Sequence, residues 1–352
     1  LIKDQGVKAE NILAVTFTNK AASEMASRVL ALIGENPLEI KGISLDRRGL
    51  PMLGTFHSVC ARILRRDGYL LGYKKSFSIF DEDDSAKIIK EIIKELALDD
   101  KRISLSGIRN YISSAKNELI TPEEYTKTAT GYFQKIVAEI YPKYQAELLR
   151  NNALDFDDLI NQVVRLFQTN QAVLAEYQER WPYILIDEYQ DTNHAQYILV
   201  KLLANKNRNL CVVGDDWQSI YSWRGANFRN ILDFEKDYPE AITIKLEQNY
   251  RSTKAILEAA HRVIVQNENR SDKKLWTDNE PGSKIVVYQA LNESGEGRFV
   301  IEESERLVRE EKINLNKIAV LYRTNAQSRA IEAELVRFNV PYRIVGGVRF
   351  YE

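Results

Sequence analysis

The sequence predicts an α/β fold, in which a parallel sheet carries an all-helical insertion and is followed by the start of a second α/β unit. Short apolar runs without polar alternation recur, as expected for strands covered on both faces of a parallel sheet. Polar residues follow each run directly, and helical patterns separate the runs. The stretch 80–151 has helical patterns but no such run. The runs of the first unit are Ile12–Phe17, Met52–His57, Tyr183–Ile186 and Leu210–Asp215.

The composition indicates an ordinary globular protein of two or three domains. The chain has 352 residues, with 44% hydrophobic and 28% charged residues and a formal net charge of −1. This charge gives no global signal for nucleic-acid binding, which would therefore depend on a local groove. No apolar run reaches membrane-spanning length and no signal peptide is evident. Cys60 and Cys211 form no metal or disulfide pattern, which predicts a reducing, cytoplasmic location.

The first two runs each lead into a helix. Thr18 or Asn19 can cap the helix that follows Ile12–Phe17. The helix after Met52–His57 starts at Ser58 and carries three arginines, which face either water or phosphate. Taken alone, these arginines indicate a solvated face.

Residues 80–151 are predicted to form an all-helical insertion in the first α/β domain. Asp81–Ser85 can cap an amphipathic helix whose isoleucines form one apolar stripe. Further helices are predicted near Ser104–Ala115, Pro122–Thr128 and Tyr132–Leu149.

Leu154–Leu159 begins the helix that leads to the central strand. Its acidic residues suit a helix N-terminus electrostatically. Phe156 lies between two of them and is either a core anchor or an exposed stacking ring. The local pattern by itself favours the core.

The central run Tyr183–Ile186 ends at two adjacent carboxylates, Asp187 and Glu188. Open α/β sheets bind ligands at the carboxyl ends of their strands. These acids are therefore candidates for holding Mg²⁺ and for orienting an attacking water. The alternative is that they only begin the next helix. Because residues 191–193 already supply cap candidates for that helix, we favour the metal and water roles.

The run Leu210–Asp215 is followed by a loop rich in aromatic residues, with Trp217, Tyr221 and Trp223 close to Arg224. Exposed rings beside an arginine form a platform for unstacked bases, worth about 1–3 kcal/mol per stacked base. The alternative is that the rings fill the core. A Tyr-x-Trp-Arg-Gly pattern directly after a candidate phosphate site favours stacking.

A fifth predicted strand, Ala241–Leu246, leads to Arg251 and to a helix that Ser252 is expected to cap. Arg251 lies between strand and helix, where it can neutralise charge on a terminal phosphate. The alternative is an interdomain salt bridge. The second unit is predicted to have strands at Ile285–Tyr288, Ile318–Asn325 and Tyr342–Val345, helices at 297–311 and 326–338, and a turn at Gly346-Gly347.

Several segments together resemble the motifs of one family. They are Thr16–Ala22, Gly54–His57, Asp187–Asn193, Gly214–Ala226, Gln248–Ser252 and Tyr322–Arg329. In kind and order they resemble the motifs of the UvrD/PcrA/Rep family of superfamily 1 DNA helicases. The resemblance covers almost the whole chain, and the motifs together are far more specific than any one of them.

The resemblance implies a RecA-like P-loop NTPase fold. Residues 1–79 and 152–245 would form the first motor domain, 80–151 its helical insertion, and 246–352 the N-terminal part of a second RecA-like domain. It also implies an ATP-dependent 3′–5′ DNA helicase and translocase. The partners would be single-stranded DNA and duplex junctions, beside repair or replication proteins, and the cofactors ATP and Mg²⁺.

The resemblance further implies roles for individual residues. Asp187 would hold Mg²⁺, Glu188 would act as the base for the hydrolytic water, and Gln218 would sense the γ-phosphate. Arg251 would be an arginine finger, and Tyr250 would stack on the adenine. The residues expected to line the single-strand track are Phe17, Asn19, Thr55, His57, Phe156, Tyr221, Trp223, Arg224, Arg323 and Asn325.

The sequence departs from the family pattern in a few places. No Gly-x-x-x-x-Gly-Lys-Ser/Thr segment occurs. In the family this loop precedes the position of Leu1, so we expect a truncated chain, with later motifs beyond Glu352. We therefore expect the chain by itself to lack ATP hydrolysis, and a non-catalytic single-stranded-DNA-binding module is the alternative.

A purely structural protein is a third hypothesis, which the intact site residues disfavour. Trp217 stands where an acid is commoner in the family.

Overall fold

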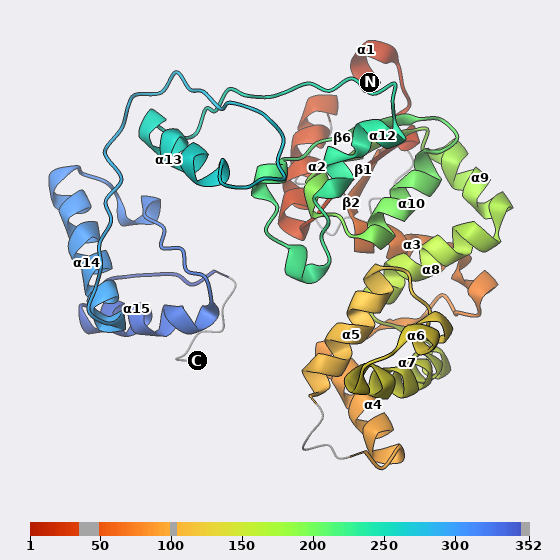
Figure 1. Ribbon diagram of the computed structural model, residues 1–352. Helices are drawn as coiled ribbons and strands as arrows, with labels where there is room; N and C mark the ends of the chain where they lie inside the picture. Colours follow the sequence, from red (N-terminus) through yellow and green to blue (C-terminus); the bar gives the residue numbers. More distant parts are fainter. Residues whose placement is uncertain (35–48, 99–103, 346–352) are drawn as a thin grey trace. The chain divides into compact units, whose positions relative to one another are not determined.

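The structure is a computed structural model that describes residues 1–34, 49–98 and 104–345. The chain forms two compact units (Figure 1). The first unit comprises Leu1–Leu246 and Gln266–Lys273, and the second comprises Glu247–Val265 and Lys274–Glu352. The turn predicted at Gly346-Gly347 lies outside the described residues.

A four-stranded parallel sheet forms the centre of the first unit, with the strand order β2-β1-β5-β6. Its strands are β1 (Ile12–Thr16), β2 (Met52–Thr55), β5 (Tyr183–Ile186) and β6 (Asn209–Val212). Thr16 pairs with Thr55, and Ile186 pairs with both Val15 and Val212. All these strands therefore end at one edge of the sheet, and the residues that follow them meet there. The predicted parallel α/β sheet is confirmed.

Helices cover both faces of this sheet, which is why its strands are apolar without alternation. Leu13 and Val15 face a core that includes residues of α3, α8, α9 and α10. Ala14 faces the other way and packs with Ala26 of α2 and with Leu53. The helices are α2 (Asn19–Ile33), α3 (Phe56–Asp67), α8 (Phe156–Thr169), α9 (Gln171–Arg180) and α10 (His194–Ala204).

Side-chain caps fix the starts of two of these helices. The Thr18 hydroxyl accepts the Ala21 amide over 3.1 Å, so Thr18 caps α2. Asn193 caps α10 and forms a capping box with Gln196. Of the cap candidates at residues 191–193, Asn193 is the one that caps α10. Asp187 and Glu188 are therefore not the cap of this helix.

The stretch 80–151 contains only helices in its described part, and these form a group beside the sheet (Figure 1). The helices have an apolar core of their own. They are α4 (Glu82–Glu95), α5 (Leu105–Asn117), α6 (Pro122–Thr128) and α7 (Tyr132–Arg150). The short strands β3 (Ser78–Ile79) and β4 (Ala153–Leu154) pair in parallel where the chain leaves for this group and returns from it.

A buried lysine joins the helical group to α8. Lys116 of α5 is 1% exposed, and its ammonium lies 2.6 Å from Asp155 Oδ2 and 2.8 Å from Asp158 Oδ1. The Tyr144 hydroxyl of α7 donates to the same Asp155 oxygen over 2.9 Å. Burial alone would lower the pKa of Lys116, but the two carboxylates raise it well above its ordinary value. The ammonium therefore stays charged and fixes the N-terminus of α8 against the helical group.

The described part of the second unit contains three longer helices, of which α14 and α15 pack on each other. They are α13 (Lys254–Ile264), α14 (Glu293–Glu310) and α15 (Asn325–Arg337). Within the described residues, the remaining short helices are α1 (Ile2–Gln5), α11 (Arg229–Leu232), α12 (Phe234–Asp237) and the 3-10 helices η1 (Ala9–Asn11), η3 (Gly68–Leu71), η4 (Tyr189–Asp191), η5 (Asp216–Gln218), η6 (Ser222–Arg224) and η7 (Leu315–Lys317).

Several predicted strands are wrong. Among the described residues, no strand forms at Ala241–Leu246, Ile285–Tyr288, Ile318–Asn325 or Tyr342–Val345. Ile242, Val287 and Leu321 in these runs are 87%, 91% and 93% exposed. A strand requires a neighbour that pairs with its backbone N–H and C=O groups. An apolar run indicates that a segment tends to be buried, but it does not show that another strand lies beside the segment to pair with it.

The predicted cap of α13 is also wrong by one residue. Thr253, not Ser252, occupies the cap position, and its side chain makes no capping hydrogen bond. The amide of Ser252 instead donates to Asn249 Oδ1 over 2.7 Å. An Asx turn therefore organises the chain before this helix.

Candidate functional site

Asp187 and Glu188 leave the carboxyl end of β5 in a tight turn. The Asp187 amide donates to the Val15 carbonyl over 2.9 Å, which continues the pairing of β5 with β1. Glu188 adopts the left-handed region with φ 55° and ψ 42°, and its amide donates to Asp187 Oδ1 over 3.0 Å. A non-glycine residue in this region costs on the order of 1 kcal/mol and persists when its surroundings hold it. Here the Tyr189 amide holds the turn by donating to the Val213 carbonyl over 3.0 Å.

Gln190 orients Glu188 and connects it to the next strand. Its side chain is 1% exposed, and its Nε2 donates to Glu188 Oε2 over 2.8 Å. Its Oε1 accepts the Asp215 amide over 2.9 Å. Sequence reasoning assigned no role to Gln190. The available signal was its place two residues after Glu188, because an amide there can both donate to a carboxylate and accept from a backbone.

Gly214 leaves room for this arrangement at the end of β6. A Cβ on Gly214 would lie 2.5 Å from Gln190 Oε1 and 2.8 Å from Ile231 Cδ1. The backbone of this residue must therefore approach Gln190 more closely than any side chain permits.

Gln218 completes a hydrogen-bonded chain at this edge. Its side chain is exposed, and its Nε2 donates to Asp215 Oδ2 over 2.7 Å. Glu188, Gln190, Asp215 and Gln218 are thus linked in series. A displacement of any one of these groups is passed to its neighbours.

Asp187 is the residue that fits a magnesium ion. In the described part of the chain, no group of three His, Cys, Asp or Glu side chains is arranged to hold a metal. Mg²⁺ is commonly bound by only one or two carboxylates, with water and phosphate oxygens filling the remaining positions. The exposed Asp187 carboxylate at the end of a strand suits that mode of binding.

Tyr250 and Arg251 belong to the second unit, where both are exposed. The Arg251 amide donates to Asn249 Oδ1 over 3.0 Å. The Tyr250 hydroxyl donates to Gln248 Oε1 over 2.6 Å. The Asx turn at Asn249 therefore sets the backbone from which both side chains extend.

Aromatic side chains gather beside the carboxylate edge of the first unit. Phe17, which follows β1, stacks on Tyr221 with a centroid distance of 5.3 Å and an interplanar angle of 29°. Tyr221 also contacts Trp223, with ring centroids 6.4 Å apart. Trp223 is 67% exposed, so the alternative that it fills the core is wrong.

Phe156 is exposed rather than buried. It is 51% exposed at the first turn of α8, and its ring meets His57 edge-on at 6.0 Å. The local preference for the core is therefore wrong. The apolar core positions of α8 are taken by other residues, such as Leu159 and Val163, and the first turn projects beyond them.

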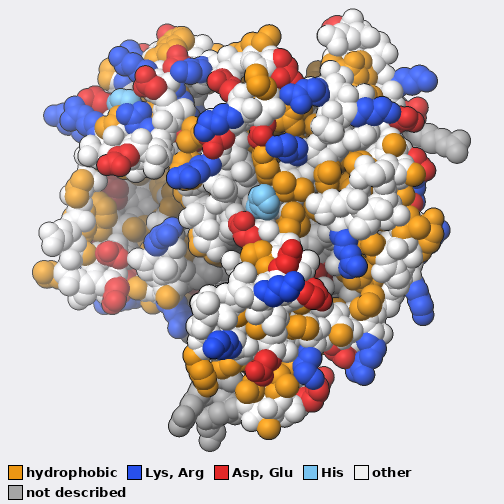
Figure 2. All heavy atoms as spheres, turned by 45° about the vertical axis from the view of Figure 1, so that its right-hand side comes forward, with side chains coloured by type: hydrophobic (Ala, Val, Ile, Leu, Met, Phe, Trp, Pro, Cys, Tyr) orange, Lys and Arg blue, Asp and Glu red, His pale blue; other side chains and the backbone are white. Residues whose placement is uncertain are grey.

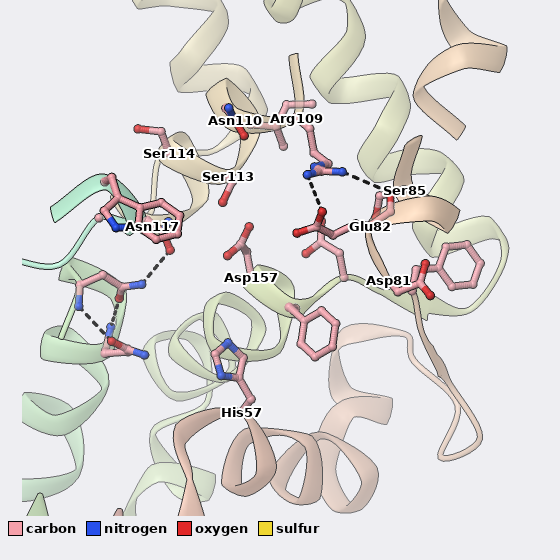
Figure 3. A pocket seen from close by; sticks show the side chains of 18 of the residues that line it. His57, Asp81, Glu82, Ser85, Arg109, Asn110, Ser113, Ser114, Asn117 and Asp157 are labelled. Carbon is pink, nitrogen blue, oxygen red and sulfur yellow. Dashed lines mark hydrogen bonds and ion pairs between the residues drawn. The ribbon is translucent and has the colours of Figure 1, made fainter. Parts of the chain in front are cut away.

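Four of the predicted track residues, Phe17, His57, Phe156 and Trp223, line one pocket of about 630 Å³. Its other wall is the helical group, with polar residues of α5 facing Asp157 and His57 (Figure 3). Such a volume, lined by both aromatic rings and polar groups, suits a base with its sugar.

Several ionisable groups in this pocket have shifted pKa values, among them Asp191, whose pKa burial raises to about 6. Burial, assisted by the neighbouring Asp155, raises the pKa of Asp157 to about 6. Burial lowers the pKa of His57 below its ordinary value. Both shifts favour the neutral forms, although Asp157 with a pKa of about 6 is still anionic at neutral pH.

The other predicted track residues lie elsewhere. Thr55 is buried and caps α3 through a capping box with Ser58, which gives it a structural role. Asn19 is the exposed first residue of α2, and Arg323 and Asn325 are exposed residues of the second unit. The side chain of Arg224 lies outside what the structure describes.

The surface shows no large basic patch on the face drawn in Figure 2, where basic, acidic and apolar side chains are interspersed. This distribution agrees with the formal net charge of −1. Within the described residues, no helix combines the length and the apolar character needed to cross a membrane.

Comparisons with known proteins agree with the sequence motifs. Residues 1–239 match the UvrD/REP helicase N-terminal domain, and residues 244–352 match the UvrD-like helicase C-terminal domain. The chain is 51% identical over 352 residues to the ATP-dependent DNA helicase PcrA of Bacillus subtilis strain 168. The aligned region covers 100% of this chain and 46% of that protein. It is 50% identical to the helicase of the same name from Staphylococcus aureus strain Mu50, of which it covers 47%.

The chain thus spans about half the length of the curated relatives that it matches. The two family models together cover nearly all of its residues, in the order in which the motifs occur. The resemblance inferred from the motifs is therefore confirmed, and the chain belongs to the UvrD-like helicase family.

Proposed function

We propose that the full-length protein carrying this chain is an ATP-dependent DNA helicase that moves 3′ to 5′ along single-stranded DNA. It separates strands at duplex junctions during repair or replication, and it works in the cytoplasm. The observation that carries the proposal is the hydrogen-bonded series from Glu188 to Gln218 at the carboxyl edge of the sheet, beside a pocket lined with aromatic rings.

The ATP side of the reaction follows from the residues at this edge. Asp187 would hold Mg²⁺, and the ion would supply positive charge against the terminal phosphates. Glu188 accepts the proton of the attacking water, and Gln190 keeps its carboxylate turned toward that water. Gln218 reads the γ-phosphate through its amide.

The second unit supplies two further groups. Arg251 neutralises the charge that develops during phosphoryl transfer, and Tyr250 stacks on the adenine. Both side chains extend from one Asx turn, so they reach the nucleotide or leave it together.

The DNA side depends on stacking. Phe17, Tyr221 and Trp223 form a stepped series of rings, and the His57 and Phe156 rings lie in the same pocket as Trp223. Bases unstacked from a single strand bind such rings with little sequence preference. The loop that carries Tyr221 and Trp223 begins at the 3-10 helix containing Gln218, so a change at the γ-phosphate reaches the rings through a few residues of backbone.

The substitution Glu188→Gln in the full-length protein tests the proposal. Loss of a general base typically costs about 10²- to 10⁴-fold, so we expect the DNA-stimulated kcat for ATP to fall by that factor. Affinity for single-stranded DNA should be unchanged. Glu179→Gln, at an exposed glutamate of α9, is the matched control and should behave as wild type. Ordinary DNA-stimulated ATP hydrolysis by Glu188→Gln would contradict the proposal.

A further inference from the structure

The segment Gln266–Lys273, here named the strap, follows α13 of the second unit but packs in the first unit. There it lies against the loop that carries Gln218. The Ser271 amide and hydroxyl donate to the two Asp216 carboxylate oxygens over 2.7 and 2.5 Å. The Trp217 indole Nε1 donates to the Ser271 carbonyl over 3.1 Å. The strap is therefore fixed to the residues that immediately precede Gln218.

Lys273 ends the strap with its ammonium between two carboxylates. It forms an ion pair with Asp215 and lies 3.4 Å from Asp216 Oδ1. The same ammonium lies 4.7 Å from the centre of the Trp217 ring, on its face. The Trp217 ring thus adds an attractive contact for the Lys273 ammonium beside the two carboxylates.

The electrostatics of this cluster depend on the strap. Burial alone would raise the pKa of Asp216, but the donors of Ser271 and the charge of Lys273 lower it. The side chains of Lys273 and Asp216 are 15% and 6% exposed, so water screens their interaction only weakly. Removal of the ammonium would leave Asp215 and Asp216 as neighbouring anions with little solvent around them.

Lys273 acts on Gln218 through Asp215. Asp215 Oδ1 accepts the Trp217 amide over 3.0 Å and pairs with Lys273, which fixes the rotation of the carboxylate. Its other oxygen, Oδ2, accepts a hydrogen bond from Gln218 Nε2 over 2.7 Å. The position of Gln218 therefore depends on a cation that lies far from it in the sequence.

The residues that follow Lys273 are hydrogen-bonded to the segment that precedes Arg251. The Lys274 amide donates to Glu247 Oε1 over 3.0 Å, and the Trp276 amide donates to the Glu247 carbonyl over 3.0 Å. The Asn249 amide in turn donates to the Trp276 carbonyl over 2.8 Å. Since Asn249 also holds the Arg251 backbone, the chain that leaves Lys273 is paired with the turn that presents Arg251.

We propose that Lys273 is a positioning residue for ATP hydrolysis, which holds Gln218 through Asp215. This inference rests on the proposed function of Gln218 at the γ-phosphate. A misplacement of about 1 Å in such a group can cost on the order of a hundredfold in rate. Loss of Lys273 affects turnover more than ATP binding, because Gln218 contributes to the step that follows binding.

The test compares variants of the full-length protein in DNA-stimulated ATP hydrolysis, measured well below the unfolding temperature of each variant. Lys273→Met should lower kcat by about ten- to a hundredfold, with a smaller change in KM for ATP. Lys273→Arg keeps the cation and should restore most of kcat. Lys274→Met, at the adjacent and exposed lysine, should match wild type in both parameters. Glu188→Gln is measured beside them.

The outcomes separate this inference from the proposed function. A wild-type kcat for Lys273→Met, or an equal loss for Lys273→Met and Lys273→Arg, would overturn the role of Lys273 while leaving the proposed function intact. An active Glu188→Gln, or a full-length protein without ATP hydrolysis, would overturn the proposed function and this inference together. A loss of kcat that Arg restores and that Lys274→Met does not share would support the role of Lys273.

Discussion

Glu188 and Gln218 are the two ends of one series of hydrogen bonds along the carboxyl edge of the sheet. Glu188 Oε2 accepts Gln190 Nε2 over 2.8 Å, Gln190 Oε1 accepts the Asp215 amide over 2.9 Å, and Asp215 Oδ2 accepts Gln218 Nε2 over 2.7 Å. The series joins the turn after β5 to the loop after β6. The side chain of Gln190 is its centre, and Gly214 leaves the space that this side chain occupies.

Replacement of Gln190 tests this series. Gln190→Met keeps the volume of the side chain but removes both hydrogen bonds, so Glu188 loses its orienting partner. We expect kcat for ATP in the full-length protein to fall about ten- to a hundredfold, with a smaller change in KM. Gln168→Met, at an exposed glutamine of α8, is the control and should leave kcat unchanged. A wild-type kcat for Gln190→Met would show that Glu188 needs no such partner.

The buried Lys116 should be important for stability. Lys116→Met removes the ammonium that contacts Asp155 and Asp158 and leaves two buried carboxylates without it. Breaking a buried ion pair in this way costs about 3–5 kcal/mol of unfolding free energy, measured by urea denaturation. Lys143→Met removes the exposed pair with Glu95 and should cost less than about 1 kcal/mol. Similar unfolding free energies for the two variants would contradict this account of α5.

The exposed ring of Trp223 should contribute to DNA affinity. Trp223→Ala removes one stacking surface, worth about 1–3 kcal/mol, so the Kd for a single-stranded oligonucleotide should rise about five- to a hundredfold. Tyr132→Ala, at an exposed ring on the helical group, provides a matched loss of an aromatic residue away from the pocket. Equal affinities for Trp223→Ala and Tyr132→Ala would argue for a different DNA path.

Asp157 should make DNA binding depend on pH. Its pKa of about 6 means that it is anionic at neutral pH and neutral in more acidic solution. Bound DNA adds negative charge nearby and therefore favours the neutral acid, so binding takes up a proton. Affinity for an oligothymidylate should then rise as the pH falls through about 6, by about two- to fivefold at low salt.

The variant Asp157→Asn separates this effect from other titrations. The other ionisable groups that line the pocket include Asp81, Glu82, Arg109, Asp155, Asp191 and His57. Burial raises the pKa of Asp191 to about 6, and His57 gains positive charge only below its ordinary pKa. Asp157→Asn should reduce the rise near pH 6 and leave the part due to Asp191, together with any contribution of His57 at lower pH. An unchanged pH profile of the Kd in this variant would exclude Asp157 as the titrating group.

The sequence predicts the first unit well and the second unit poorly, for one physical reason. The runs at β1, β2 and β5 are strands because each lies beside another strand of the same sheet. The run Ile285–Tyr288 has an equally apolar pattern but no described partner, and it forms no strand. The local sequence pattern indicates the tendency of a segment to be buried, whereas strand formation also requires a second strand that pairs with its backbone.

The site shows the same limit. Asp187, Glu188 and Gln218 could be predicted to meet, because the ends of parallel strands share one edge. The roles of Lys116 and Lys273 could not, since each lysine contacts acids that are distant in the sequence. Phe156 was misjudged because an aromatic residue between acids has the same local pattern whether its ring packs inward or projects from a helix N-terminus.

The most direct test of the central claim is a crystal structure of the full-length protein with single-stranded DNA, Mg²⁺ and a non-hydrolysable ATP analogue. We predict that a metal ion lies on Asp187 and that Gln218 and Arg251 each place a nitrogen about 3 Å from a γ-phosphate oxygen. We also predict that DNA bases contact the rings of Tyr221 and Trp223. A structure in which Gln218 and Arg251 point away from the γ-phosphate would contradict the account.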